Sequence, residues 1–200
     1  APVVVEEAKK VLVTLADGTT NTITDKTRQS VDDEDFSSAV YSKADLVFNG
    51  SGTLNVNAGY RNGIKSTDDL KVVSGTFNIT SNEDGIIGKD FLGIKDGKFT
   101  IKSGSDGMKS TYDTDTSKGN IVITGGEFDI TASNDGVHCN GDILISGGNL
   151  TISSGDDGVH ADDNLQVDGG TIDIKKCCEG LEGVHITLND GDISIVASDD

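Results

Sequence analysis

The chain has 200 residues, with 34 acidic and 16 basic side chains and a formal net charge of −18 at pH 7. This excess of negative charge argues against nucleic acid as a partner, because phosphates would be repelled. No apolar run approaches the roughly 20 residues of a membrane span, so no membrane partner is expected. No signal peptide is present, although Ala1-Pro2 suits the start of a processed chain. The richness in Asn, Thr and Gly is typical of extracellular bacterial proteins, so we expect a location outside a bacterial cell or on its surface. We also expect a monomer.

The N-terminal part is expected to close one end of the fold. Val11, Val13 and Leu15 occupy alternate positions, which indicates a strand, and a turn signal follows at 17–18. Residues 39–40 resemble a degenerate first repeat. We therefore divide the chain into N-terminal cap strands over 1–38 and repeats over 39–200.

From residue 63 onward a glycine followed by an apolar residue recurs at intervals of 22, 22, 29, 22 and 22 residues, at Gly63, Gly85, Gly107, Gly136, Gly158 and Gly180. Within one unit, apolar pairs split by a single residue occur three times, as Val137/Cys139, Ile143/Ile145 and Leu150/Ile152. This is the period of β-strands, and helical stripes are absent. The pattern predicts an all-β fold, a right-handed parallel β-helix. It is a three-sided solenoid of about 22 residues per coil, with equivalent strands stacked roughly 4.8 Å apart.

Two irregularities interrupt the repeats. The 29-residue interval contains an enlarged corner loop over 111–119, and insertions in solenoids usually mark the functional face. The chain stops at residues 198–200, where the pattern calls for another glycine, so we expect more protein to follow in the natural polypeptide.

An acidic residue precedes most of the repeat glycines, as at Asp84, Asp106, Asp135, Asp157 and Glu179. Stacked carboxylates repel one another unless a cation lies between them. Calcium takes six to eight hard oxygen ligands, so Ca²⁺ is the predicted cofactor. The candidate ligands are Asp84, Asp90, Asp106, Asp135, Asp156, Asp157, Asp162 and Asp163. The alternative is a solvated acidic surface on which Asp and Asn serve as turn formers.

Histidines and lysines share the outward side of the first strand. His138 and His160 are 22 residues apart, in register with Lys65 and Lys109. Such a strip could receive a sugar carboxylate, although a plain surface ladder is equally open. The candidate sugar-binding residues are Lys65, Lys109, His138, His160 and Tyr112, the last as a stacking platform in a chain without Trp.

The cysteines give no functional signal. Cys139 occupies an inward position equivalent to Ala161, which favours a small core residue. A disulfide between the adjacent Cys177 and Cys178 would be strained. No Cys/His set has the spacing of zinc ligands, so no zinc site is expected.

Several segments carry a resemblance to a known family: residues 15–25 (LADGTTNTITD), 60–70 (YRNGIKSTDDL), 84–90 (DGIIGKD), 105–111 (SDGMKST) and 134–138 (NDGVH). They resemble bacterial extracellular carbohydrate-binding proteins. These are calcium-containing right-handed parallel β-helices akin in fold to polysaccharide lyases and associated with cellulose and pectic acid-sugar binding. The resemblance spans nearly the whole chain. It departs at 179–182, where two cysteines precede the acid and Glu182 replaces the usual outward residue.

The resemblance implies binding rather than turnover. We therefore predict a non-catalytic protein for acidic plant cell-wall polysaccharide, pectin or polygalacturonate and secondarily cellulose, with calcium bridging Asp to uronate. Pectate lyases of this fold pair calcium with an arginine base, whereas only Arg28 and Arg61 are present and neither is expected on the acidic corner. The alternatives are a calcium-dependent lyase and a structural or adhesive solenoid stiffened by calcium. The lyase would use His138 as base, or Lys65 or Lys109 if desolvation lowered the pKa of that lysine.

Overall fold

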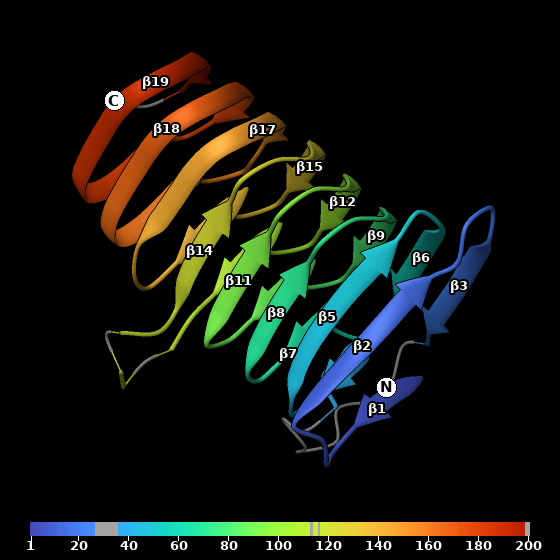
Figure 1. Cartoon of the computed structure of the whole chain (residues 1–200). Helices are drawn as coiled ribbons and strands as arrows, with labels where there is room; N and C mark the ends of the chain where they lie inside the picture. Colours follow the sequence, from blue (N-terminus) through green and yellow to red (C-terminus); the bar gives the residue numbers. More distant parts are fainter. Residues whose placement is uncertain (27–35, 113, 116, 199–200) are drawn as a thin grey trace.

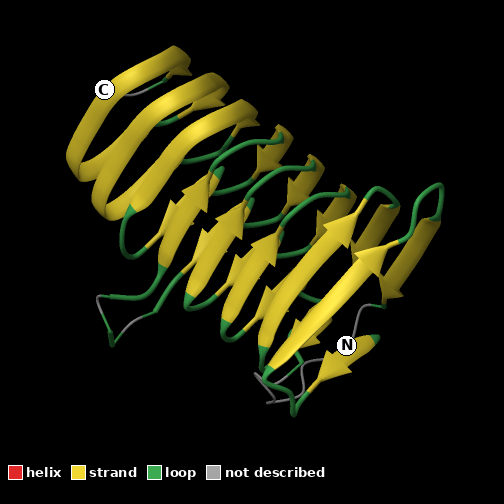
Figure 2. Ribbon diagram, viewed as in Figure 1, coloured by secondary structure: helices red, strands yellow, loops and turns green. Residues whose placement is uncertain are grey.

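The structure is a computed structural model that describes residues 1–26, 36–112, 114–115 and 117–198. Its described elements are all β-strands, joined by turns and loops (Figure 2). They form a single 19-stranded sheet wound into a stack of coils (Figure 1). Within the described ranges there is no helix long and apolar enough to cross a membrane.

Each coil contributes three strands, and each strand pairs in parallel with its equivalents in the neighbouring coils. The first face consists of β1 (Val3–Val5), β4 (Ser38–Ser42), β7 (Asn62–Ser66), β10 (Ile86–Gly88), β13 (Met108–Ser110) and β16 (Val137–Cys139). The second consists of β2 (Lys10–Leu15), β5 (Asp45–Gly50), β8 (Asp69–Val72), β11 (Phe91–Ile94) and β14 (Asn120–Ile123). The third consists of β3 (Thr20–Asp25), β6 (Thr53–Ala58), β9 (Thr76–Ser81), β12 (Lys98–Ser103) and β15 (Glu127–Ala132). In the last coils β17 (Ile143–Ser153), β18 (Val159–Cys177) and β19 (Leu181–Ala197) run through more than one face.

The register confirms the predicted parallel β-helix. Ile86 pairs with Ile64 on one side and with Met108 on the other, and Val137 pairs with Met108 and Val159. These are the apolar residues that follow the repeat glycines, so equivalent residues of successive units meet across the coils. The repeat length in the sequence is therefore the length of one coil.

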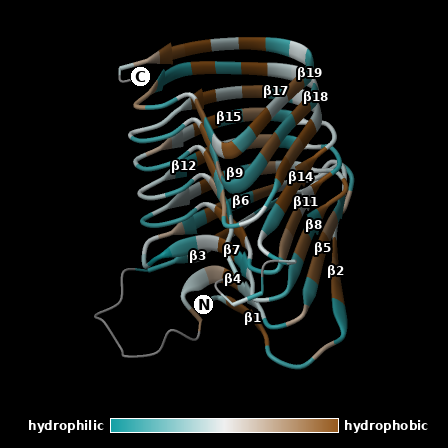
Figure 3. Cartoon of the chain, turned by 90° about the vertical axis from the view of Figure 1, so that its left-hand side faces the viewer, coloured by the Kyte–Doolittle hydropathy of each residue, from teal (hydrophilic) through white to brown (hydrophobic). Residues whose placement is uncertain are grey.

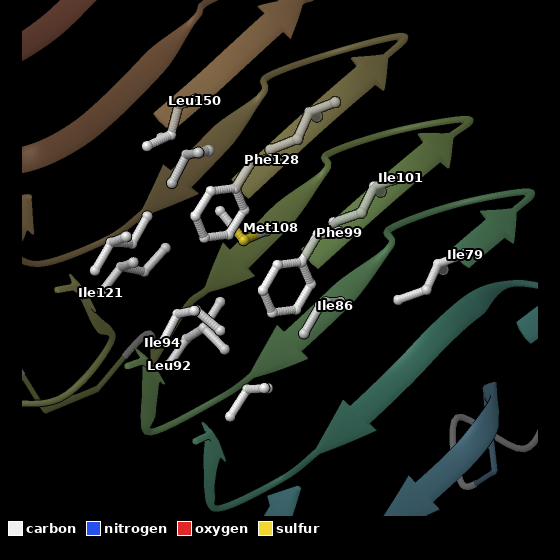
Figure 4. Close-up of a cluster of buried hydrophobic side chains, with 14 of the residues drawn as sticks. Ile79, Ile86, Leu92, Ile94, Phe99, Ile101, Met108, Ile121, Phe128 and Leu150 are labelled. Atoms are coloured by element: carbon white, nitrogen blue, oxygen red, sulfur yellow. The ribbon is translucent and has the colours of Figure 1, made fainter. Parts of the chain in front are cut away.

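Inward side chains form columns that fill the narrow core. The rings of Phe77 and Phe99 stack at 5.1 Å between centroids, and those of Phe99 and Phe128 at 4.8 Å. Leu150 and Ile172 continue this column, as the sequence predicts (Figure 4 shows Phe99, Phe128 and Leu150). Hydrophobic segments lie along the strands, whereas the turns on the left of Figure 3 are hydrophilic or neutral. Repeated burial of the same side-chain type in each coil stabilises the stack.

The repeat glycines are required by close approach of neighbouring coils. A Cβ added to Gly107 would lie 2.5 Å from the carbonyl oxygen of Gly136 and 2.5 Å from Cγ2 of Ile130. The N–H of Gly107 donates to the carbonyl of Asp135 at 2.9 Å. At other corners glycine serves its expected conformational role, for example at Gly97, where φ is +138°.

Both ends of the chain belong to the stack. The three N-terminal strands pair in parallel with β4, β5 and β6, so they form the first coil of the stack, and residues 39–40 lie in the second coil. At the other end β19 pairs with β18 and exposes apolar side chains such as Val184 and Val196. The enlarged loop lies where the spacing predicts it, between β13 and β14.

Candidate functional site

A column of carboxylates runs along the corner that precedes the first strand of each coil. At four successive positions the backbone N–H of the column residue donates to the side-chain oxygen of its equivalent in the preceding coil. The pairs are Asp84 to Asn62 at 3.1 Å, Asp106 to Asp84 at 3.1 Å, Asp135 to Asp106 at 3.2 Å and Asp157 to Asp135 at 3.0 Å. Each of the accepting oxygens is therefore already used within the column.

Lysine occupies the space between two members of this column. Lys109 Nζ lies 2.5 Å from Oδ2 of Asp106 and 3.8 Å from Oδ1 of Asp84. Asp106 is fully buried, at 0% exposure. Burial alone would raise the pKa of Asp106, but hydrogen bonds from His138, Lys109 and Asn134 outweigh it and hold the pKa well below its ordinary value. An ammonium group thus balances the charge that the sequence analysis assigned to calcium.

Lys109 does not have the lowered pKa that a catalytic base needs. Burial would lower the pKa of Lys109, but its contacts with Asp106 and Asp84 outweigh burial and raise the pKa. Lys109 was expected to act as a lyase base only if its pKa were lowered. Its pKa is raised instead, so that condition is not met.

The two histidines stack on each other above Lys109. Their ring centroids are 4.9 Å apart, with planes inclined by 23°. His138 Nδ1 lies 3.4 Å from Oδ2 of Asp106, and His160 Nδ1 lies 3.3 Å from Oδ2 of Asp157. Oδ1 of Asp162 faces both Nε2 atoms, at 3.8 Å and 3.2 Å. The hydrogen bond with Asp106 raises the pKa of His138 against the opposing effect of burial.

Within the described residues, the last members of the column form no ion pair with a lysine. Asp135 and Asp157 are each 3% exposed. Burial raises the pKa of Asp135, and the hydrogen bond from the backbone of Asp157 offsets part of this. Burial, followed by the nearby Glu182 and Asp135, raises the pKa of Asp157. Buried carboxyl groups whose ionisation is disfavoured therefore gather toward the C-terminal end of the column.

A groove of about 430 Å³ lies over the first face at the other end of this column. Its lining includes the basic side chains Arg61, Lys65, Lys89 and Lys109. Lys65 and Lys109 lie in one register column, since both pair with Ile87, as the sequence predicts. Two carboxylates, Glu83 and Asp84, line the same groove, so basic side chains outnumber acidic ones there although the chain as a whole has a net charge of −18.

Arg61 lies on the acidic corner, contrary to the sequence-based expectation. Its Nε is 3.6 Å from Oε1 of Glu83, and both side chains line the groove together with Asp84. Arg61 directly precedes Asn62, where the hydrogen-bonded column begins, so the stacking of coils carries it to this corner. Arg28 lies outside the described residues.

Tyr112 stands in the enlarged loop beside the groove. The ammonium groups of Lys89 and Lys118 lie 5.1 Å and 4.6 Å from its ring centroid. Lys118 also forms an ion pair with Asp90, which anchors the loop to the stack. Because Lys89 also lines the groove, the loop adds an aromatic face to its margin.

A second acidic cluster lies at the corner between the first and second strands. Carboxylate oxygens of Asp45, Asp68 and Asp69 lie within 4.8 Å of one another. Burial, followed by the charges of Asp45, Asp90 and Asp69, raises the pKa of Asp68. Oδ1 of Asp90 is buried and has no hydrogen-bond partner in the described part of the chain. Lys71 engages Oδ2 of Asp69 at 2.7 Å. Oxygen ligands from successive coils with excess negative charge fit the preference of calcium.

The residues predicted as calcium ligands are distributed over several places. Four of them form the column: Asp84, Asp106, Asp135 and Asp157. Asp156 lies near the C-terminal end of the column, and Asp162 faces the histidines. Asp90 adjoins the second acidic cluster, and Asp163 is exposed outside these groups. Among the predicted sugar-binding residues, Lys65 and Lys109 line the groove and Tyr112 adjoins it, whereas His138 and His160 lie farther along the column.

Sequence reasoning did not select two parts of this arrangement. It missed Arg61 and Lys89 as groove residues, because only the stacking of coils brings them together. It named Asp68, Asp69 and Asp90 as possible oxygen donors beyond the first strand but missed Asp45, which joins Asp68 and Asp69 in the second acidic cluster. A signal for that cluster existed, since Asp45 and Asp69 each precede a leucine and these leucines pair with each other.

Comparison with known proteins gives consistent results. The model of the family "carbohydrate-binding domain-containing protein" matches residues 1–200. A carbohydrate-binding domain-containing protein of Acetivibrio thermocellus is 35% identical over 82 residues, which is 40% of this chain and 29% of that protein. The chain therefore matches less than a third of that relative's length. A solved structure, described as the polysaccharide lyase-like protein from C. thermocellum in a gadolinium derivative, superposes with a TM-score of 0.70 and 25% identity. The match covers 96% of this chain and 71% of the other.

Proposed function

Since the chain belongs to the family of carbohydrate-binding domain-containing proteins, we propose that it is a non-catalytic extracellular protein for acidic plant cell-wall polysaccharide. The ligand class is pectin or polygalacturonate, and the basic groove over the first face binds it. Calcium at the second acidic cluster completes the site.

The basic groove is the observation that carries this proposal. A surface of net charge −18 repels a polyanion unless cations are concentrated where it binds. Arg61, Lys65 and Lys89 offer donors that match uronate carboxylates. Lys109 donates a hydrogen bond to Asp106, and its Nζ also lies 3.8 Å from Oδ1 of Asp84. Its side chain is still 23% exposed, which leaves N–H groups for a ligand.

The second acidic cluster supports the role of calcium. Thr67 lines the groove, and the next residue is Asp68 of the cluster, so the two features adjoin. The raised pKa of Asp68 and the unpartnered oxygen of Asp90 mark a place where a cation would relieve repulsion. A hard cation with open coordination positions there could bridge these carboxylates to a uronate.

Neutral cellulose is a second candidate ligand, favoured by the outward surface of the third face. A groove of about 590 Å³ there is lined by Thr22, Asn55, Asn78 and Thr100 among others. Hydroxyl and amide groups in successive coils offer donors and acceptors to sugar hydroxyls.

Titration with oligogalacturonate in calcium buffer tests the basic groove. Lys65→Glu and Lys89→Glu should each weaken binding roughly ten- to hundredfold, because each loses a charge-assisted hydrogen bond and adds a repulsive charge. The matched control is Lys98→Glu, an exposed lysine of the third face, which should bind as wild type. If all three variants bound oligogalacturonate as tightly as wild type, the groove would be rejected as the binding site.

Titration in excess EDTA tests calcium separately. Wild type should lose most of its affinity for oligogalacturonate, and Asp68→Asn should behave in calcium as wild type does in EDTA. The matched control Asp129→Asn, at an exposed position of β15, should keep the calcium response. Undiminished binding in EDTA would reject the calcium bridge while leaving the basic groove in place.

A further inference from the structure

The outward column of the first strand changes sign along the stack. Lys109, His138, His160 and Glu182 pair in register one after another. Lys109 neutralises the carboxylates beside it, whereas Glu182 adds a carboxylate next to Asp157. The C-terminal end of the column therefore combines two carboxylates with one imidazole.

The three side chains have the spacing of metal ligands. His160 Nδ1 lies 3.3 Å from Oδ2 of Asp157 and 3.4 Å from Oε2 of Glu182, and the three ligand atoms lie within 4.8 Å of one another. In a tetrahedral zinc site with bonds of about 2.0–2.1 Å, neighbouring ligand atoms are about 3.3–3.4 Å apart. The two measured separations match the edges of such a tetrahedron.

Asp162 lies beside the second nitrogen of the imidazole. Its Oδ1 is 3.2 Å from Nε2 of His160, an ion-pair distance. A carboxylate that accepts the Nε2 proton leaves the lone pair on Nδ1, which faces Asp157 and Glu182. Metal-binding histidines commonly have this carboxylate partner on the second ring nitrogen.

A bound cation would stabilise the buried carboxylate of Asp157. Asp157 is 3% exposed, and its Oδ1 is buried with no hydrogen-bond partner within the described residues. Beside Asp106 this cation is the ammonium group of Lys109. Beside Asp157 the residue in the same register column is Glu182 and not a lysine.

We propose that His160, Asp157 and Glu182 bind a divalent transition-metal ion of the zinc type. The fourth position is open to water or an anionic ligand. An imidazole with two carboxylates suits zinc, whereas calcium prefers an all-oxygen shell of six to eight ligands. The inference does not depend on the proposed carbohydrate function, since it uses a different part of the column.

The test is calorimetric titration of the metal-stripped 200-residue chain with zinc chloride, with thermal melts in zinc, in calcium and without metal. Wild type should bind one zinc ion at this site, and zinc should raise its melting temperature. Glu182→Lys should abolish this binding while leaving the protein folded, because lysine at this position reproduces the contact of Lys109 with Asp106 and Asp84. The matched control His185→Gln, at an exposed position of β19, should keep the zinc response.

Three outcomes would overturn the proposal. They are no zinc response in wild type, the same zinc affinity in Glu182→Lys as in wild type, and calcium competing equally for the site. The first would mean that a proton shared by the two carboxylates, rather than a metal, relieves their repulsion.

Discussion

Removing the ammonium group of Lys109 should destabilise the fold more than removing any ordinary surface lysine. Asp106 is 0% exposed and Lys109 Nζ lies 2.5 Å from its Oδ2. Loss of one partner of a fully buried ion pair costs about 3–5 kcal/mol. The Lys109 side chain is 23% exposed and His138 also faces Asp106, so we expect a smaller loss for Lys109→Met, about 2–3 kcal/mol.

The assay is urea unfolding followed by circular dichroism, with Lys98→Met as the control. Lys98 pairs with Glu127 at 3.1 Å, but both side chains are about two-thirds exposed, at 65% and 64%. Exposed pairs contribute about 0–1 kcal/mol, so the control should lose little stability. The loss for Lys109→Met should be smaller at pH 6 than at pH 9, because the raised pKa of His138 keeps a compensating charge beside Asp106 at the lower pH. A loss for Lys109→Met no larger than that of Lys98→Met would refute the reasoning.

Three further outcomes are expected. Without added metal, the free energy of unfolding should fall as the pH rises from 6 to 9. Because the pKa of His138 is raised in the folded state, protonated His138 stabilises the fold fully below its unfolded-state pKa, and this stability is lost as the pH rises through its folded-state pKa. The raised pKa of Asp157 acts in the same direction, because ionising this carboxyl group is less favourable in the folded than in the unfolded chain. A free energy of unfolding that stays flat or rises with pH would contradict both pKa shifts. Gly107→Ala should cost about 1–3 kcal/mol in the same urea assay, because the new Cβ meets the carbonyl of Gly136 at 2.5 Å; an unchanged midpoint would show that the coils can separate freely. Calcium should raise the melting temperature of wild type and not that of Asp68→Asn, and equal shifts would remove the second acidic cluster as the calcium site.

The fold could be predicted from the sequence because its determinants recur at one fixed interval. Alternation of inward and outward residues identified the strands, and the distance between Gly136 and Gly158 gave the length of a coil. The column of Phe77, Phe99 and Phe128 followed directly, because residues one period apart must meet. No long-range information beyond the period was needed.

The candidate site could be predicted only in part. The period placed Asp106 and Asp135 in one column, but their partners depend on side-chain directions that spacing does not give. Lys109 turns back three residues to bind Asp106, so a column that looked unneutralised already has its own cation. No zinc site was predicted because no Cys/His set has the short sequence spacing of local zinc motifs. The ligands His160 and Glu182 are instead separated by one coil, which is the relevant spacing in a solenoid.

The most direct test of the proposed function compares oligogalacturonate with its methyl ester at equal chain length by calorimetric titration in calcium. If cations in the groove recognise uronate carboxylates, the free acid should bind at least tenfold more tightly than the ester. The preference should disappear in Lys65→Glu. Equal affinity for the acid and the ester would show that the charge of the sugar is not what this protein recognises.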